Sequence, residues 1–242
     1  MYVEQFGNLK LIKEKNKMIL VKPNYEILSI MNSAPYDNPL RLIELAGRTC
    51  YKSEDKITNE STIIFVEKIN DLGHESVLEH SAMSVKFICD RGVSHELVRH
   101  RLCSFSQEST RYCNYKGGVT FVIPPWINIP EAKYNHKNID SIYFFEPNST
   151  IDVGNPWASA MAYSEETYIE LLDDGWSPQQ ARSVLPNSLK TEIVVTANFR
   201  EWKHIFKLRT SKAAHPQMRE IMIPLLNECK KLIPVIFDNI KY

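Results

Sequence analysis

The chain has 242 residues, enough for one large domain or two small ones, and 43% are hydrophobic, so a substantial core is available. Its 29 basic and 29 acidic residues give a net charge of zero, which argues against salt-driven binding to nucleic acid or to a membrane surface. Five widely spaced cysteines without a C-x-x-C pair indicate reduced thiols, a cytoplasmic location and no structural zinc, and no apolar run is long enough to span a membrane.

The first half of the chain predicts alternating helices and strands. Residues 38–49 and 62–72 have helical spacing of apolar residues, and Gly73 is a plausible end for the second helix. Residues 81–90 alternate and predict a strand. A helix capped at Ser94 is expected to run to about Cys103 and to carry Arg99.

The middle of the chain is less regular. The segment SFSQEST (104–110) is expected to be a loop, and GGVTFVIPP (117–125) predicts a strand that ends at its prolines. Residues 126–156, rich in Pro, Asn and Tyr, predict an irregular excursion. A long helix is expected from about Pro156 to Leu172.

The C-terminal part predicts a short helix capped at Ser177, with a proline at its first position. A strand at 189–198 and a helix capped at Asn198 follow, and residues 216–233 form a last amphipathic helix. We therefore predict the α+β class: a single domain over 1–242 with an antiparallel sheet flanked by helices. The few glycines and the absence of a Gly-rich loop after any strand exclude a GxGxxG dinucleotide fold.

The stretch RHRLCSFSQESTRY, residues 99–112, concentrates anion donors in a chain without net charge. It opens with the basic triplet at 99–101, and an amide, a hydroxyl and a guanidinium follow at Gln107, Ser109 and Arg111. On an extended loop these three would share one side and could hold the phosphate and base of a nucleotide. A solvated basic patch is the alternative, and it is common for such a triplet.

Two further arginines are candidates for anion binding. The apolar spacing of the helix that starts at Phe199 continues onto Arg209, which should therefore point toward the protein and need an acceptor. Arg182 follows the capped short helix and could bind phosphate. A structural ion pair for Arg209, a surface role for Arg182, and a solvated face for Arg200 and His204 are the competing interpretations.

Zinc binding and catalysis by a cysteine or serine nucleophile are less well supported by the sequence. His74 and His80 are six residues apart, which does not match the helical zinc-protease pattern. Cys103 lies near His100, but no acid in a recognisable arrangement would orient that base, so buried inert thiols are expected. No G-x-S-x-G turn surrounds a serine of the loop.

The spacing RHR-x7-S-x-R over 99–111 resembles the signature of the flavin-dependent thymidylate synthases (ThyX family). GHES…EH at 73–80, RSVLPNSLKTEIVVTANFREW at 182–202 and LRT…AHPQMR at 208–219 are similar to the same family. The resemblance covers most of residues 40–233.

The resemblance implies a homotetrameric methyltransferase of dTMP biosynthesis, with active sites where subunits meet and with no nucleic-acid or membrane partner. It would convert dUMP to dTMP with FAD as cofactor, methylenetetrahydrofolate as carbon donor, NADPH as reductant and no protein nucleophile. Arg209 would be the catalytic residue, stabilising negative charge on the pyrimidine. Reduced flavin would supply hydride, and no metal would be needed.

The resemblance also implies two sets of contact residues. The flavin contacts would be Ser76, Arg99, His100, Arg101, Gln107, Asn198, Phe199, Arg200 and His204. The dUMP contacts would be Glu96, Leu97, Val98, Arg99, Gln107, Glu108, Ser109, Thr110, Arg111, Arg182 and Arg209.

Two other classes of function stay open. A nucleotide- or RNA-binding module would use the basic triplet with Phe105 and Tyr112, and its affinity would fall steeply with salt. A flavin oxidoreductase without dUMP chemistry would tolerate the loss of Arg209.

Overall fold

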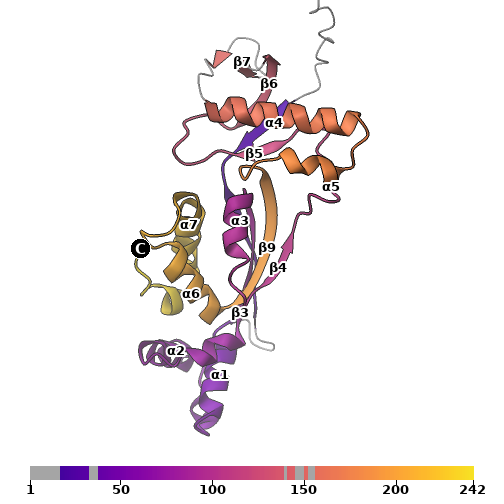
Figure 1. Cartoon of the computed structure of the whole chain (residues 1–242). Helices are drawn as coiled ribbons and strands as arrows, with labels where there is room; N and C mark the ends of the chain where they lie inside the picture. The colour runs from indigo at the N-terminus through magenta and orange to yellow at the C-terminus, as the bar shows by residue number, and fades with distance from the viewer. Residues whose placement is uncertain (1–16, 33–37, 139–140, 145–149, 152–155) are drawn as a thin grey trace, which may run out of the picture. The chain divides into compact units, whose positions relative to one another are not determined.

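The computed structural model describes residues 17–32, 38–138, 141–144, 150–151 and 156–242, which form two compact units (Figure 1). Unit 1 comprises the described residues up to Lys22 together with Glu108–Lys190. Unit 2 comprises Pro23–Gln107 and Thr191–Tyr242. The two units are interleaved along the chain, and the prediction of one domain over 1–242 stays a prediction.

Unit 2 is built on a four-stranded sheet in the order β2-β3-β9-β4. β2 pairs antiparallel with β3, and β4 pairs antiparallel with β9, which confirms the predicted antiparallel sheet in an α+β arrangement. The strands are β2 (Asn24–Ile30), β3 (Ala82–Asp90), β4 (Ser104–Gln107) and β9 (Lys190–Asn198).

Helices cover the apolar face of this sheet. Alternate residues of β3 and β9 are buried, and aromatic side chains from α6 and α8 pack with them, including Trp202 against Phe87 with ring centroids 6.4 Å apart. The helices of unit 2 are α1 (Arg41–Thr49), α2 (Ser61–Asp71), α3 (Arg91–Leu97), α6 (Phe199–Arg209), α7 (Pro216–Leu232) and α8 (Pro234–Phe237), with 3-10 turns η1 (Glu54–Lys56) and η2 (Glu75–His80).

Two neighbouring strands lead directly into capped helices, and this positions the site. Asp90 ends β3 and accepts a hydrogen bond from the backbone N–H of Val93 at 2.8 Å, which starts α3. Asn198 ends β9 and accepts from the N–H of Glu201 at 2.8 Å, which starts α6 as predicted. The N–H of Phe199 donates to the carbonyl of Ser81, and Ser84 hydrogen-bonds Thr196, so the neighbouring strands β3 and β9 run antiparallel. The helices α3 and α6 therefore start at opposite ends of this pair, and their C-terminal ends meet where Arg209 contacts Glu96.

Unit 1 contains a second sheet in the order β5-β1-β6-β7-β8. Its pairs are antiparallel except that β1 pairs parallel with β5, so the antiparallel prediction does not hold for that pair. The strands are β1 (Lys17–Val21), β5 (Thr120–Val122), β6 (Ala132–Asn138), β7 (Ser141–Phe144) and β8 (Thr150–Ile151), and the helical elements are α4 (Pro156–Asp173), α5 (Pro178–Ala181) and the turn η3 (Arg182–Val184).

The helix predicted to carry Arg99 is shorter and starts earlier than expected. Asp90, not Ser94, is the cap, and α3 ends at Leu97. Ser94 is buried inside the helix and donates to the carbonyl of Arg91 at 3.0 Å. Arg99 therefore lies in the turn after the helix, and the prediction that places it on a helix is wrong.

Two segments predicted to be irregular form strands. Residues 104–107 become β4 because their backbone pairs with residues 193–196 of β9, a partner that local sequence does not reveal. The segment 126–156 was predicted to be an irregular excursion, but it contains β6, β7 and β8, which pair with β1 and with one another. The rest of that prediction, on 139–140, 145–149 and 152–155, lies outside the described residues.

The remaining helices and strands lie near their predicted positions. α2 ends one residue before Leu72, and Gly73 follows with the positive φ of 73° that favours glycine. Within the described ranges, no helix is both long and apolar enough to cross a membrane.

Candidate functional site

The candidate site in unit 2 centres on a contact between two residues that are 109 positions apart in the sequence. The Nε of Arg209 donates a hydrogen bond to Nε2 of His100 at 2.9 Å. Arg209 occupies the last turn of α6, and His100 follows α3. As the apolar spacing predicted, the Arg209 side chain is turned inward and only 15% exposed.

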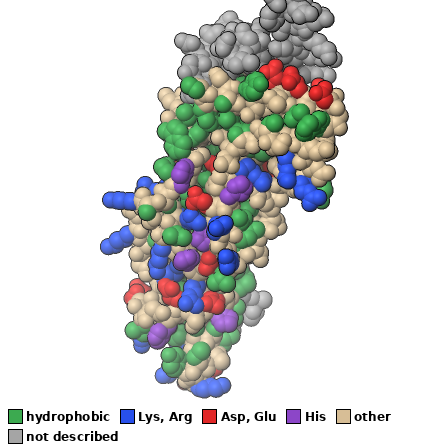
Figure 2. Space-filling model, in the orientation of Figure 1, with side chains coloured by type: hydrophobic (Ala, Val, Ile, Leu, Met, Phe, Trp, Pro, Cys, Tyr) green, Lys and Arg blue, Asp and Glu red, His purple; other side chains and the backbone are tan. Residues whose placement is uncertain are grey.

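Glu96 binds the rest of the Arg209 guanidinium. Nη1 donates to the carboxylate Oε2 of Glu96 at 2.6 Å, and Nη2 donates to its backbone carbonyl at 3.0 Å. All three nitrogens of Arg209 therefore have acceptors, which holds the planar group in one orientation. The Glu96 side chain is 38% exposed, so this pair borders solvent. Figure 2 shows basic, acidic and histidine side chains close together over α3 and α6.

His100 is held in its neutral form. It is buried, and this burial, with Arg209 and His204 nearby, lowers the pKa of His100 to about 4. Because Nε2 accepts a hydrogen bond, the ring proton belongs on Nδ1, which lies 3.5 Å from Oε1 of Glu201. Burial raises the pKa of that carboxyl, while His204 opposes the shift.

The outer face of α6 carries two more of the expected residues. Arg200 and His204 are exposed, as the solvated-face interpretation predicted. Nη1 of Arg200 donates to Oε1 of Glu79 on η2 at 2.5 Å. The His204 ring lies edge-on to His100, with centroids 5.8 Å apart. The Asn198 side chain is already used as the cap of α6.

Gln107 joins the end of β4 to α3 and β9. Its Nε2 donates to Oγ of Ser94 at 2.9 Å and to Oγ1 of Thr191 at 3.2 Å. Both hydrogen bonds use the side-chain NH₂ group of Gln107, and together they fix the direction of its side-chain carbonyl oxygen. Replacing this amide with a carboxylate would remove both donated bonds.

A second group of expected residues lies in unit 1. Nη1 of Arg182 donates to Oγ1 of Thr110 at 2.9 Å, which brings the arginine after α5 to the Ser109–Arg111 segment. Glu108 accepts from the hydroxyl of Tyr115 at 2.8 Å and from Nζ of Lys190 at 3.1 Å. The expected dUMP contacts are thus divided between two groups, one in each unit.

Some expected contact residues have side chains that are unavailable to a ligand. Leu97 and Phe199 lie in the core with 1% and 0% exposure, so only their backbones could make the contact. Val98, at 39%, and Ser76 are exposed. The prediction that each of these residues contacts a ligand stays a prediction.

His100, Glu201 and His204 also have ligand atoms within 4.8 Å of one another. That spacing suits a metal ion, but the Arg209 hydrogen bond occupies Nε2 of His100 and its charge opposes a cation there. The geometry by itself assigns no metal, and the prediction of no metal stays a prediction.

Sequence reasoning did not identify Glu201 or Lys203 as parts of the site. Glu201 lies in the first turn of the helix that starts after Asn198, and its carboxylate faces His100. Lys203 is 1% exposed and lies 2.5 Å from Oε1 of Glu75, next to Ser76 on η2. A lysine between Trp202 and His204 gives no local sign of burial, because its partner comes from a distant turn.

Comparison with known proteins identifies the family. A family model described as "Thymidylate synthase complementing protein" matches residues 31–235. A flavin-dependent thymidylate synthase of Geobacter sulfurreducens is 35% identical over 210 residues, which are 84% of this chain and 82% of the relative. Another from Corynebacterium efficiens is 33% identical over 203 residues, 82% of this chain and 78% of the relative.

A similar fold occurs in the crystal structure of a UMP/dUMP methylase, PolB, from Streptomyces cacaoi bound with 5-Br dUMP. The TM-score is 0.69 at 24% identity, over 91% of this chain and 96% of that chain. The family indicated by the signature between 99 and 111 is thus the family of relatives that match most of the sequence. The chain therefore belongs to the family of thymidylate synthase complementing proteins, the flavin-dependent thymidylate synthases.

Proposed function

We propose that the protein catalyses the reductive methylation of dUMP to dTMP, with methylenetetrahydrofolate as carbon donor and NADPH as reductant. The one-carbon unit replaces the C5 hydrogen of uracil, and the two electrons that convert it to a methyl group come from NADPH. Tetrahydrofolate and NADP⁺ are the other products. The relatives' names and the dUMP analogue bound to PolB support this substrate.

The observation that carries the proposal is the oriented guanidinium of Arg209. Its hydrogen bonds to Glu96 and His100 hold it in one plane before any substrate binds. A preoriented cation stabilises negative charge that develops on a pyrimidine ring without reorganisation during the reaction. Neutral His100 accepts from Arg209 and does not compete with it as a second cation.

The polar groups around α3 and α6 fit a bound FAD. Arg99 and Arg101 are exposed, and neither forms an ion pair with any residue that the structure describes. Guanidinium groups of this kind suit a diphosphate. Ser76, Arg200 and His204 add further donors on the neighbouring surfaces of η2 and α6. FAD, when bound, supplies the hydride chemistry that protein side chains lack.

The dUMP phosphate is proposed to bind Ser109, Arg111 and Arg182. Arg182 is oriented by Thr110, and Arg111 is exposed with its guanidinium carbon 5.4 Å from the centre of the Tyr112 ring. We further propose a homotetramer in which the active sites form between subunits.

No protein nucleophile is proposed. Burial, with a smaller effect of Glu201, raises the pKa of Cys103 to about 12, so almost no thiolate exists at neutral pH. This is the thiol closest in sequence to His100, and its environment does not activate it.

The proposal is tested with the purified protein. A yellow protein with a flavin spectrum should release tritium from [5-³H]dUMP only when both methylenetetrahydrofolate and NADPH are present. An Arg209→Ala variant should keep flavin and its reduction by NADPH but lose tritium release. A flavin-containing wild type that releases no tritium under these conditions would overturn the proposed activity.

A further inference from the structure

The carboxylate of Glu108 is bound by two donors that come from different parts of unit 1. Its Oε1 accepts a hydrogen bond from the hydroxyl of Tyr115 at 2.8 Å, and its Oε2 accepts from Nζ of Lys190 at 3.1 Å. The side chains of Lys190 and Glu108 are only 20% and 17% exposed. This ion pair is therefore shielded from solvent more than an ordinary surface pair, and both carboxylate oxygens are used.

Tyr115 and Lys190 are themselves held by the core of unit 1. The Tyr115 ring packs against Tyr168 of α4 with centroids 6.0 Å apart, and Tyr168 is fully buried. The backbone N–H of Tyr115 also donates to the hydroxyl of Tyr168 at 3.4 Å. Lys190 opens β9 directly after Leu189, which is buried and bridged to β5. Glu108 is thus attached to packed elements of the unit through both of its partners.

Glu108 directly precedes the turn that is proposed to bind the dUMP phosphate. The carbonyl of Ser109 accepts from the N–H groups of Tyr112 and Cys113 at 3.1 and 2.9 Å. The Ser109 hydroxyl oxygen also accepts from the N–H of Arg111 at 3.3 Å. The shape of this turn is therefore set by its own hydrogen bonds.

The position of the turn within unit 1 is set by contacts on both sides of Ser109. On one side, Nη1 of Arg182 donates to Oγ1 of the buried Thr110. On the other side, Glu108 is bound by Tyr115 and Lys190. A turn that is fixed in this way before the nucleotide arrives loses less conformational entropy when it binds.

Lys190 also removes an electrostatic obstacle. A carboxylate next to a phosphate site opposes the binding of an anion, because like charges repel over short distances. The ammonium of Lys190 neutralises the charge of Glu108 beside this turn. Since Tyr115 and Lys190 occupy the Glu108 carboxylate, its geometry suits a positioning role better than a direct contact with dUMP.

We propose that Tyr115 and Lys190 are positioning residues for dUMP: they hold Glu108, neutralise its charge and so fix the phosphate-binding turn. The identity of the phosphorylated ligand rests on the proposed function. Two consequences separate this role from a purely structural contact. Loss of Lys190 alone should harm dUMP binding more than loss of both charges. The defect should also appear in the affinity for dUMP and not in the chemical step, because the Arg209 contact lies in unit 2.

The test is calorimetric titration of the flavin-loaded protein with dUMP. Lys190→Met leaves the Glu108 carboxylate without its cation and should weaken dUMP binding by about tenfold. The double variant Lys190→Met, Glu108→Gln has no unpaired charge and should recover most of the lost affinity. Lys190→Arg keeps the charge and should stay within about threefold of wild type. Tyr115→Phe removes only the hydroxyl and should weaken binding by about threefold.

Lys116→Met is the matched control. Lys116 pairs with Asp173 in the same unit, but both side chains of this pair are more than half exposed, so the variant should bind dUMP like wild type. Equal dUMP affinity of Lys190→Met and wild type would overturn the proposal. A double variant that binds dUMP no better than Lys190→Met would overturn it as well.

Glu108→Gln decides the question if Lys190→Met does not fold. Its amide can accept from Lys190 and donate to the Tyr115 oxygen, so the variant should bind dUMP at least as tightly as wild type. A loss of about tenfold would instead make the Glu108 carboxylate a direct ligand of dUMP and would reject the positioning role.

Tritium release is measured separately at varied dUMP. Lys190→Met should raise the KM for dUMP and leave kcat within about twofold of wild type. A wild type that binds dUMP but releases no tritium would reject the proposed methylation, while the affinities of the variants would still decide the positioning role. Normal activity and normal dUMP affinity in Lys190→Met would reject only the positioning role. A wild type that binds no dUMP would overturn both proposals.

Discussion

The Nε of Arg209 and the Nε2 of His100 are 2.9 Å apart, and this contact joins the end of α6 to the turn that follows α3. It orients the guanidinium through a neutral acceptor and leaves Glu96 as the carboxylate in contact with Arg209. Chemistry at this site therefore depends on two properties, the plane of the arginine and the protonation of the histidine.

Replacing Arg209 tests the first property. Arg209→Lys keeps the positive charge but cannot donate to His100 and to both acceptors of Glu96 at once. We expect dUMP methylation to fall by about 100-fold or more while flavin content is unchanged. Tritium release measures dUMP methylation, and the visible spectrum measures flavin content. Lys207→Ala, a change at an exposed residue two positions before Arg209 on α6, is the control, and an active Arg209→Lys enzyme would contradict the assigned role.

The protonation of His100 should appear in the pH dependence of stability. Its pKa is lowered from 6.5 to about 4, so the unfolded state binds the proton more tightly. The free energy of unfolding should therefore be highest above pH 6.5 and fall by roughly 3 kcal/mol as the pH decreases to 4. Denaturant unfolding across this range measures the slope.

His100→Gln is the matched variant for this prediction. Its amide oxygen can accept from Arg209 but does not titrate. The difference in slope between wild type and variant isolates His100, since Glu201, whose pKa burial raises, is present in both proteins. Identical slopes would show that His100 does not titrate as described.

The buried ammonium of Lys203 should contribute measurably to stability. It is bound by Glu75 and by the side-chain oxygen of Asn70, and it ties α6 to η2. Lys203→Met should destabilise the fold by about 2 kcal/mol, because Glu75 loses its partner in a half-buried position. Lys207→Met is the control: it contacts the same carboxylate at 3.9 Å but is 57% exposed. Urea unfolding should separate the two variants, and equal stabilities would contradict the prediction.

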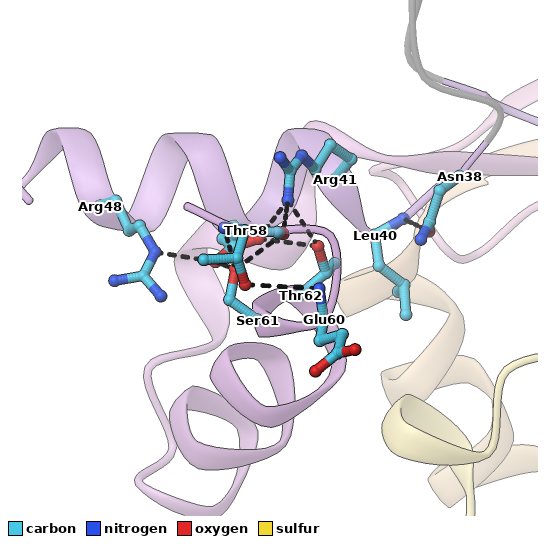
Figure 3. A network of polar contacts seen from close by, with 9 residues as sticks. Asn38, Leu40, Arg41, Arg48, Thr58, Glu60, Ser61 and Thr62 are labelled. Carbon is cyan, nitrogen blue, oxygen red and sulfur yellow. Dashed lines mark hydrogen bonds and ion pairs between the residues drawn. The ribbon is translucent and has the colours of Figure 1, made fainter. Parts of the chain in front are cut away.

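The buried carboxylate of Glu44 should also contribute measurably to stability. Burial raises its pKa, but hydrogen bonds from Ser61, Thr62 and Arg48 outweigh this and the net pKa is lowered (Figure 3). Its stabilisation is therefore present above pH 4.5 and lost as the pH falls through the lower, folded-state pKa. Glu44→Gln should cost about 2 to 3 kcal/mol at pH 7 and progressively less as the pH falls below 4.5. A pH-independent cost in urea unfolding would argue against a charged Glu44.

Cys103 should be dispensable for catalysis. Its pKa of about 12 leaves too little thiolate to attack a pyrimidine. Cys103→Ala should keep at least about half of the wild-type tritium release, since no step uses a nucleophile. A folded, flavin-containing Cys103→Ala protein without activity would contradict a mechanism that lacks a protein nucleophile.

The positions of most helices and strands followed from local patterns. Asn198 caps α6 and Gly73 follows α2 as predicted, because caps and glycine stops act through their nearest neighbours. The position of strand β4 did not follow from a local pattern, since the hydroxyl-rich stretch 104–107 becomes extended only by pairing with β9. The end of α3 was misplaced for a related reason: Asp90 and Ser94 are both acceptable caps, and the end of β3 selects the first.

Some properties of the candidate site also follow from local sequence, and others depend on distant segments. The spacing from Arg99 to Arg111 sufficed to indicate the family and a nucleotide, and the apolar period of α6 was enough to turn Arg209 inward, because both signals are local. The acceptors that hold Arg209, the neutral state of His100 and the burial of Lys203 depend on residues from α3, η2 and α2. Burial and long-range hydrogen bonds set these properties, and neither exists until distant segments have packed together.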